Sequence, residues 1–215
     1  MSETGNRRPL TSRDTGLAQA IARRLAASPV TPNLISQASI AAAALSGAAF
    51  WIGGTAEDAG TRAWLFVLAA LFCQLRLACN LFDGMVAVEG GKGTPDGGFW
   101  NEFPDRVADI LILAGAGYGA GEPALGWALA SLALLTAYVR ELGVSTGGPA
   151  DFAGPMAKPH RMAAITAAAL LTALEPLWGG HNEVLIVALW IIAIGTGFTA
   201  LRRAVRLVRR MRGGS

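Results

Sequence analysis

The sequence predicts an all-α integral membrane protein with six transmembrane helices and an N-terminal interfacial amphipathic helix. Hydrophobic residues make up 53% of the 215 residues and charged residues only 15%, against about 25% charged residues in soluble domains. The mean hydropathy is +0.42. A soluble fold of this size could not bury so much apolar surface, so we expect the lipid bilayer to be its solvent.

Six apolar segments approach the length of about 20 residues that a membrane-spanning helix needs. They cover residues 34–53, 63–88, 107–120, 124–143, 162–178 and 184–201. The third is expected to begin earlier, with polar residues in its first turns. We treat the chain as a single membrane domain. Residues 1–33 form a cytoplasmic or interfacial segment, residues 34–201 form the six-helix bundle, and residues 202–215 form a basic cytoplasmic tail.

Residues 16–27 have the pattern of an amphipathic helix lying in the membrane interface. Apolar side chains recur there at four-residue spacing, and Arg23 and Arg24 lie on the other side of the helix. The apolar set is Leu17, Ile21 and Leu25. A solvated N-terminal helix is the alternative.

The distribution of basic residues predicts the orientation of the chain. Arginines cluster before the first span and after the last one, and more basic residues lie in the loops 90–98 and 147–161. The N-terminal set is Arg7, Arg8, Arg13, Arg23 and Arg24. The remaining loops carry a single basic residue, Arg62. By the positive-inside rule, we expect both termini and the active site on the cytoplasmic side of the inner or plasma membrane. Because these arginines flank apolar spans, they favour contacts with membrane lipids and not with nucleic acid.

Acidic residues concentrate at the end of the second span and the start of the third. Positions 80, 83 and 87 share one helical face, as do positions 101, 105 and 109. A short glycine-rich loop joins the two helices, so we expect them to be near neighbours whose polar faces converge. Carboxylates inside membrane spans are costly and usually functional. The convergence predicts a pocket with three carboxylates and the amide of Asn80.

This donor set predicts a divalent metal site. Clustered carboxylates repel one another unless cations or protons intervene. Oxygen ligands without a nearby Cys or His favour Mg²⁺ or Mn²⁺, with Ca²⁺ a further candidate in a crystal. The alternative is that each acid pairs with an internal arginine, such as Arg76, Arg106 or Arg140. Ion pairing alone does not explain the regular spacing of the acids.

The acidic pattern resembles the motif of the CDP-alcohol phosphatidyltransferases. That family carries D-x2-D-G-x2-A-R, then G-x3-D-x3-D, and this chain carries N-x2-D-G-x2-A-V, then N-x3-D-x3-D. The matching residues are Asp83, Gly84, Ala87, Asp105 and Asp109, with Asn80 at the first acidic position. The element Pro32-Asn33-Leu-Ile-Ser36 is similar to the start of the family's first span. Val88 replaces the motif arginine, and Asn101 replaces a glycine and is followed by Glu102.

The resemblance implies a reaction in which CDP-diacylglycerol and an alcohol form a phosphatidyl-alcohol and CMP. It also implies that Asp83 and Asp105 are metal ligands, that Asp109 is both ligand and candidate base, and that Asn80 is a weaker ligand. Glu102 is a candidate to restore the missing charge at the metal. The implied donor-binding residues are Asn33, Ser36, Gly84 and Ala87, with Arg76 as a substitute for the missing arginine. Homodimers are common in the family, so we expect one here.

The loop before the fifth span predicts an anion site. Lys158 and Arg161 lie three residues apart at the expected start of a helix, where they can bind phosphate of the acceptor or donor. They can instead anchor the loop at the membrane. Glu141 either joins the acceptor pocket or pairs with Arg140.

Other functions remain open at this point. Within the family, the chain could transfer a CDP-amino-alcohol headgroup to diacylglycerol. A transporter is a different class, but transporters usually place their charged sites near the bilayer midplane, whereas these acids lie at span ends. The departures at Asn80 and Val88 favour a non-catalytic membrane partner. The sequence leaves the acceptor alcohol undecided among glycerol phosphate, inositol or its phosphate, serine and a second lipid.

Overall fold

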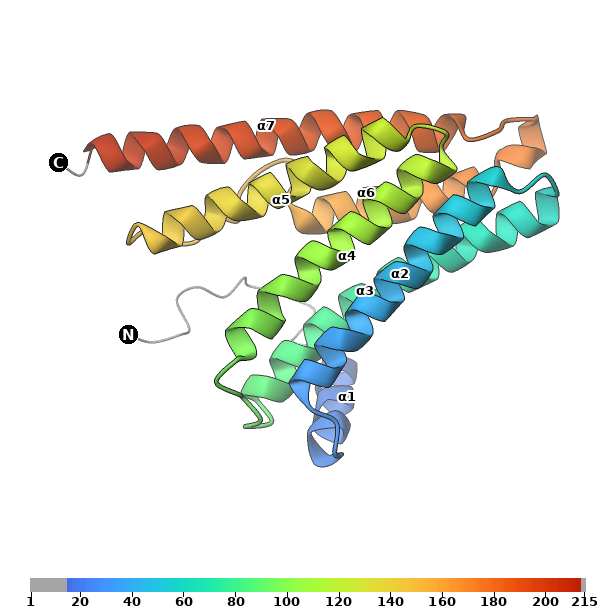
Figure 1. Cartoon of the computed structure of the whole chain (residues 1–215). Coiled ribbons are helices and arrows are strands. Elements are labelled where there is room, and N and C mark those ends of the chain that lie inside the picture. The colour runs from blue at the N-terminus through green and yellow to red at the C-terminus, as the bar shows by residue number, and fades with distance from the viewer. Residues whose placement is uncertain (1–14, 214–215) are drawn as a thin grey trace.

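The computed structural model describes residues 15–213, and every regular element in that range is helical (Figure 1). The elements are α1 (Gly16–Ala27), α2 (Pro32–Thr55), α3 (Ala59–Val88), α4 (Gly97–Gly119), α5 (Pro123–Ser145), α6 (Lys158–Thr172), the 3₁₀ helix η3 (Glu175–Trp178) and α7 (Glu183–Gly213). The all-α prediction is confirmed. Arg7, Arg8 and Arg13, predicted to fix the orientation, lie outside the described residues.

Four of the helices are long and apolar enough to cross a membrane: α2, α3, α5 and α7. Local signals explain where two of them begin. Thr31 precedes α2 and its side chain accepts a hydrogen bond from the Leu34 amide at 3.2 Å, with Pro32 in the first turn. Asp58 caps α3 in the same way, by accepting from the Thr61 amide at 2.6 Å.

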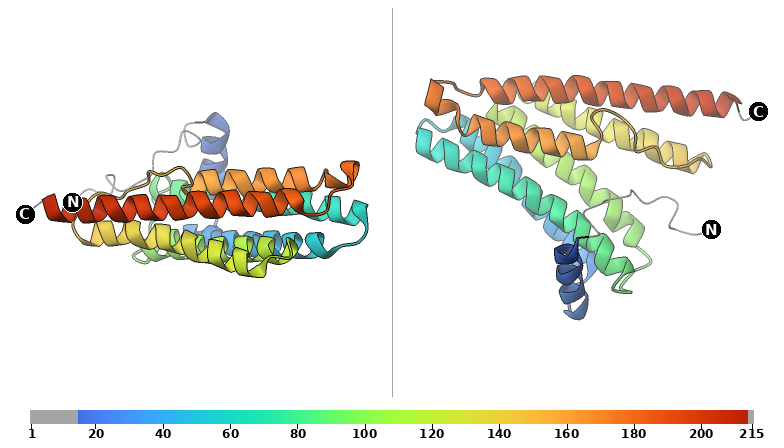
Figure 2. Two further views of the ribbon diagram at one scale, coloured as in Figure 1. Left: turned by 90° about the horizontal axis from the view of Figure 1, so that it is seen from above. Right: turned by 180° about the vertical axis from the view of Figure 1, so that it is seen from behind.

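Helices α2 to α7 form an elongated bundle, and α1 projects from one side of it, beside the end of α3 (Figures 1 and 2). Helix α2 packs along both α3 and α4, α5 packs between α4 and α7, and α6 contacts α3 and α7. Ala18 and Ala22 of α1 pack against Met85 of α3. A helix at residues 16–27 is therefore present, and its place in the membrane interface stays a prediction.

Two predicted segment boundaries are wrong. The fifth segment was expected over residues 162–178, but α6 ends at Thr172 and a 3₁₀ turn follows. Pro176 lacks the amide that would continue the α-helix, and the Glu175 carboxylate instead accepts hydrogen bonds from the next loop. At the other end, residues 202–213 were expected to be a tail but continue α7, whose 31 residues span about 46 Å at 1.5 Å per residue.

The second and third spans, predicted to be near neighbours with converging polar faces, meet through their polar side chains more than through their backbones. Helices α3 and α4 touch each other much less than each touches α2. The short connection between them fixes only the distance between two helix ends. Their polar side chains nevertheless meet near that connection, because they are long enough to cross the space that separates the two backbones.

Glycines bring α2 and α4 into close contact. A Cβ atom built on Gly115 would lie 2.3 Å from the carbonyl oxygen of Gly47 and 2.5 Å from its Cα. Backbone therefore fills the place of a side chain, as in other membrane helix pairs rich in small residues. This contact sets the distance between α4, which carries two of the motif acids, and the rest of the bundle.

Gly115→Ala should lower the thermal unfolding midpoint of the purified protein in detergent. The new methyl group overlaps backbone that cannot move aside without separating the two helices, and such overpacking typically costs about 1–3 kcal/mol. The matched control is Gly197→Ala on α7, where the nearest atom to an added Cβ is 3.9 Å away. That control should be neutral or stabilising, because Ala is favoured over Gly in helices by about 1 kcal/mol. Equal midpoints for both variants would contradict the assigned contact.

A buried polar network closes the end of the bundle opposite the motif acids. Arg62 Nη2 lies 3.0 Å from Glu175 Oε2 and donates to Asn182 Oδ1 at 2.6 Å. Asn182 Nδ2 donates to the carbonyls of Gly54 and Gly119 at 3.0 and 3.1 Å. Asn182 has a positive φ of 73°, a conformation that asparagine tolerates better than most residues. The network ties together the α2–α3, α4–α5 and η3–α7 connections.

Candidate active site

The motif acids of α4 lie in a buried cluster with three basic side chains. Arg76 Nη2 of α3 is 3.0 Å from Asp105 Oδ1 and 3.6 Å from Asp109 Oδ1. Arg161 Nη2, from the first turn of α6, is 2.6 Å from Asp109 Oδ2. Lys158, three residues earlier at the start of α6, binds Asp105 Oδ2 through its Nζ. Asp105 and Asp109 are one helical turn apart, so both can face α3 and α6.

The two motif positions on α3 reach this cluster in different ways. Asn80 Nδ2 donates to Asp105 Oδ1, which confirms that the amide and this carboxylate converge. Asp83 is buried, and its Oδ2 accepts a hydrogen bond from Ser36 Oγ of α2 at 2.7 Å. Ser36 is therefore positioned beside a motif acid, where the resemblance expects a donor-binding residue.

Asn33 takes part in a separate contact with the α3–α4 loop. Its Nδ2 lies 3.4 Å from both carboxylate oxygens of Asp96, and Thr94 Oγ1 is 3.4 Å from Asn33 Oδ1. Hydrogen bonds from Thr94 and Trp100 lower the pKa of the Asp96 carboxyl below its usual value. Asp96 is therefore ionised at neutral pH and can hold the Asn33 amide. The loop itself is fixed to the α1–α2 connection by Lys92 Nζ, which donates to the Ser28 carbonyl at 2.5 Å.

Glu102 binds two arginines. Its Oε2 is 2.8 Å from Arg106 Nη2 and also binds Arg140 Nη2 of α5. Arg140 binds Glu141 as well, at 2.7 Å, so the predicted alternative in which Glu141 pairs with Arg140 is confirmed. The suggestion that Glu102 restores charge at a metal stays a prediction, as do the donor-binding roles of Gly84 and Ala87. Val88, where the motif has arginine, is half exposed at the end of α3.

The cluster fits a divalent metal in its donor chemistry. Asp109 Oδ1 is buried and accepts no hydrogen bond, and Asp105 and Asp83 supply further hard oxygen donors of the kind that Mg²⁺ and Mn²⁺ take. Within residues 15–213, no three His, Cys, Asp or Glu side chains converge as a ready-made ion site. The reason is visible in the contacts, since basic side chains now bind the carboxylates. The ion-pair alternative is thus confirmed for Arg76, and a metal site stays a prediction.

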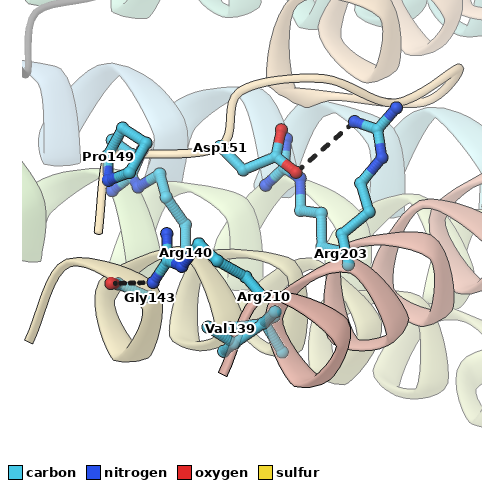
Figure 3. Close-up of a pocket in the computed structure, with 10 residues that line it drawn as sticks. Val139, Arg140, Gly143, Pro149, Asp151, Arg203 and Arg210 are labelled. Carbon is cyan, nitrogen blue, oxygen red and sulfur yellow. Dashed lines mark hydrogen bonds and ion pairs between the residues drawn. The ribbon is translucent and has the colours of Figure 1, made fainter. Parts of the chain in front are cut away.

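A second feature was not recognised in the sequence. A pocket of about 260 Å³ lies between the end of α5, the loop before α6 and the C-terminal part of α7 (Figure 3). Four arginines line it together with Asp151: Arg140, Arg203, Arg206 and Arg210. The three on α7 were assigned to a basic tail. They recur at intervals of three and four residues, and this spacing is the signal that they share a helical face.

Backbone carbonyls hold two of these arginines in place. Arg203 donates to the carbonyls of Ala153 and Thr136 at 3.0 and 2.9 Å, and Arg210 donates to the Gly143 carbonyl at 2.9 Å. Arg206 is less constrained, because its closest acidic partner is Asp151 at 3.6 Å and half of its side chain is exposed. The pocket therefore carries an excess of positive charge and suits an anionic group.

Glu102 and Arg140 connect the two features. Glu102 lies one turn before Arg106 and three residues before Asp105 on α4, while Arg140 lines the arginine pocket. The ion pair between them places the pocket beside the acid cluster. A substrate with an anionic group in the pocket would therefore have its other atoms near the motif carboxylates.

No family model matches the chain, but individual relatives do. The chain is 28% identical over 165 residues to the inner membrane protein YnbA of Escherichia coli (strain K12), covering 76% of this chain and 77% of YnbA. It is 29% identical over 194 residues to a phosphatidylinositol phosphate synthase of Streptomyces avermitilis, covering 86% of this chain and 74% of that enzyme.

Solved structures share the fold. The phosphatidylinositol phosphate synthase PgsA1 of Mycobacterium tuberculosis with CDP-DAG bound has a TM-score of 0.71 at 18% identity, covering 90% of this chain and 94% of PgsA1. PgsA1 in complex with manganese and citrate has a TM-score of 0.70 at 18% identity, covering 88% of each chain. The arrangement of helices is thus the same at this low identity.

Proposed function

We infer that this chain is a member of the CDP-alcohol phosphatidyltransferase family and that it transfers a phosphatidyl group from CDP-diacylglycerol to an alcohol, releasing CMP. The observation that carries this inference is the cluster in which Asn80, Asp105 and Asp109 meet, with Asp83 one turn from Asn80. Relatives named phosphatidylinositol phosphate synthases and the PgsA1 fold support it.

The protein is an integral membrane protein, and a divalent metal supports its reaction. When bound by Asp83, Asp105 and Asp109, with Asn80 beside them, Mg²⁺ or Mn²⁺ supplies charge stabilisation for the pyrophosphate and the leaving CMP. Asp109 also accepts the proton of the attacking hydroxyl, because its Oδ1 is the carboxylate oxygen without a hydrogen bond. Ser36, Asn33, Gly84 and Ala87 border the nucleotide, and Arg76 orients the motif acids and faces the pyrophosphate.

We propose that the acceptor is an alcohol that carries phosphate or another anionic group. The four arginines around the pocket beside Glu102 support this assignment, and so do the names of the relatives. Lys158 and Arg161 of α6 bind the motif acids, and Glu141 orients Arg140. An uncharged acceptor such as diacylglycerol would leave this positive pocket unpaired, which argues against the CDP-amino-alcohol reaction.

For the topology, we propose six membrane spans, made by α2 to α7, with both termini and the active site cytoplasmic. Helices α4 and α6 fall short of the apolar length criterion, but α4 packs against α2 and α5, and α6 packs against α3 and α7. Their buried charged residues, Asp105, Asp109 and Arg161, face the interior of the bundle and not lipid. The arginines at the end of α7 lie on the expected cytoplasmic side. A homodimer remains part of this proposal.

The decisive assay uses the purified protein with CDP-diacylglycerol, Mg²⁺ or Mn²⁺, and a panel of acceptors, and it measures CMP release. Phosphorylated polyols should support release, and uncharged polyols should support much less. Release of CMP only from a CDP-amino-alcohol with diacylglycerol would establish the other reaction of the family. No release from any donor would support a non-catalytic protein.

Arg206→Gln should raise the apparent KM for the anionic acceptor roughly tenfold or more, with the KM for CDP-diacylglycerol unchanged. A charge-assisted contact to phosphate contributes about 1.5–3 kcal/mol, and each 1.4 kcal/mol is about tenfold in affinity. Arg209→Gln is the control, since this exposed arginine lies on the same helix outside the pocket. Equal acceptor constants for the two variants would contradict the assignment of the pocket.

A further inference from the structure

Lys158 is the accessible member of the three cations that bind the motif acids. The side chains of Arg76 and Arg161 are 0% and 1% exposed, whereas that of Lys158 is 24% exposed. Lys158 also differs in its chemistry, because its charge sits on a compact ammonium at the end of a flexible side chain, which binds Asp105 Oδ2. The other oxygen of Asp105 is already held by Arg76 and Asn80.

The charges of the cluster leave no place for a divalent ion unless one cation moves. Asp83, Asp105 and Asp109 bring three negative charges, and Arg76, Lys158 and Arg161 bring three positive ones. Arg106 lies farther from Asp105 Oδ2, at 3.8 Å, and its charge is paired with Glu102 at 2.8 Å. The neutral Asn80 provides no further charge. An ion that binds Asp105 must therefore displace a basic side chain or accept strong repulsion from it. The two sealed arginines cannot leave without opening the helix packing, but the ammonium of Lys158 can swing toward the exposed side.

We propose that Lys158 is an exchangeable counter-ion of the metal site. Resting on the proposed function, the inference is that a divalent ion takes Asp105 Oδ2 and releases the ammonium, which then binds a phosphate oxygen of the substrate. Lys158 occupies Asp105 Oδ2 in the free protein, and it binds the phosphate of the substrate once the divalent ion is bound. Metal and anion binding then strengthen each other, because each removes the competitor of the other.

The first experiment measures Mn²⁺ binding to the purified full-length protein in detergent, without nucleotide, by isothermal titration calorimetry. Lys158→Met should bind Mn²⁺ about tenfold more tightly than wild type, since loss of one charge-assisted contact at this level corresponds to about 1.4 kcal/mol. Arg106→Met is the matched control. It removes a positive charge 3.8 Å from the same oxygen of Asp105, but the closest partner of Arg106 is Glu102 at 2.8 Å. General repulsion predicts equal gains for both variants, whereas exchange predicts a gain for Lys158→Met alone.

The second experiment needs no variant. The chain has two lysines, Lys92 and Lys158, and Lys92 donates to the Ser28 and Val30 carbonyls and not to a motif acid. Wild-type protein is treated with a water-soluble, amine-reactive acetylating agent. Mass spectrometry of the two lysine-containing peptides then measures how readily each side chain reacts. Saturating Mn²⁺ should increase acetylation of Lys158 severalfold and leave Lys92 unchanged.

Two different failures can be told apart. Wild-type protein that binds no Mn²⁺ would overturn the metal site and the proposed function with it. Wild-type protein that binds Mn²⁺, with Lys158→Met equal or weaker and acetylation of Lys158 unchanged, would leave the proposed function intact. That result would overturn the exchange alone and make Lys158 a fixed part of the cluster.

Discussion

Asp109→Asn should reduce CMP release by roughly 10²–10⁴-fold, the usual loss when a general base is removed. The carboxylate is 1% exposed and is held by Arg161 at 2.6 Å and by Arg76 at 3.6 Å. An amide in its place keeps the shape but loses the charge that attracts a proton or a metal ion. Steady-state assays at saturating donor should show the loss in kcat and leave the KM for the donor within a fewfold of wild type.

Metal occupancy has to be measured on the same variant. If Asp109→Asn loses both activity and bound Mn²⁺, the residue is a ligand first, and its role as base is not required to explain the loss. The control is Glu89→Gln, an exposed carboxylate directly after α3, which should retain full activity. CMP release near the wild-type rate from Asp109→Asn would refute both roles.

Glu175→Ala should produce the largest loss of stability among single substitutions in the polar network at the opposite end. The substitution leaves Arg62, which is 2% exposed, without its anionic partner. It also removes the acceptor for the amides of Asn182 and Val184, both at 2.7 Å. Breaking one side of a buried ion pair typically costs about 3–5 kcal/mol. The midpoint of thermal unfolding in detergent measures it.

A double-mutant cycle separates the pair from the rest of the network. Arg62→Met with Glu175→Met removes both charges, and replacing a buried pair by apolar residues is often close to neutral. The double variant should therefore be more stable than the single variant Glu175→Met, with a remaining loss from the two unpaired amides. Glu183→Ala, an exposed acid at the start of α7 that accepts a hydrogen bond from the His181 amide, should cost only about 1 kcal/mol. A Glu175→Ala protein as stable as Glu183→Ala would show that the network does not hold the loops together.

The sequence predicted contacts that depend on spacing within one helix. Asp105 and Asp109 share a face because they are four residues apart, and Ser36 was expected near the donor site from its place in a short motif. Asn80 and Asp105 lie on two helices, but their spacing from the connecting loop was enough to predict that they meet. These predictions use local geometry, which the order of residues contains directly.

Contacts between distant segments could not be predicted in this way. Glu175 and Arg62 are 113 residues apart in the chain, and only the path of the helices brings them together. Lys158 and Arg161 were predicted as a phosphate site from their place at the start of a helix, and nothing in their spacing indicated that the motif acids would bind them in the free protein. The turn after Thr172 likewise involves Glu175, whose partners are Arg62 in the first turn of α3 and the amides of Asn182 and Val184.

The buried Arg62 network also determines where the bundle can change shape. It joins three connections at one end of the helices, while Asp105, Asp109 and Lys158 lie near the other end of α4 and at the start of α6. A helix that pivots about a fixed end moves least beside the pivot and most at its far tip. Small changes in tilt, such as those caused by a thicker or thinner bilayer, would therefore act as a lever. They would change the distances between the carboxylates far more than the distances between the loops at the fixed end.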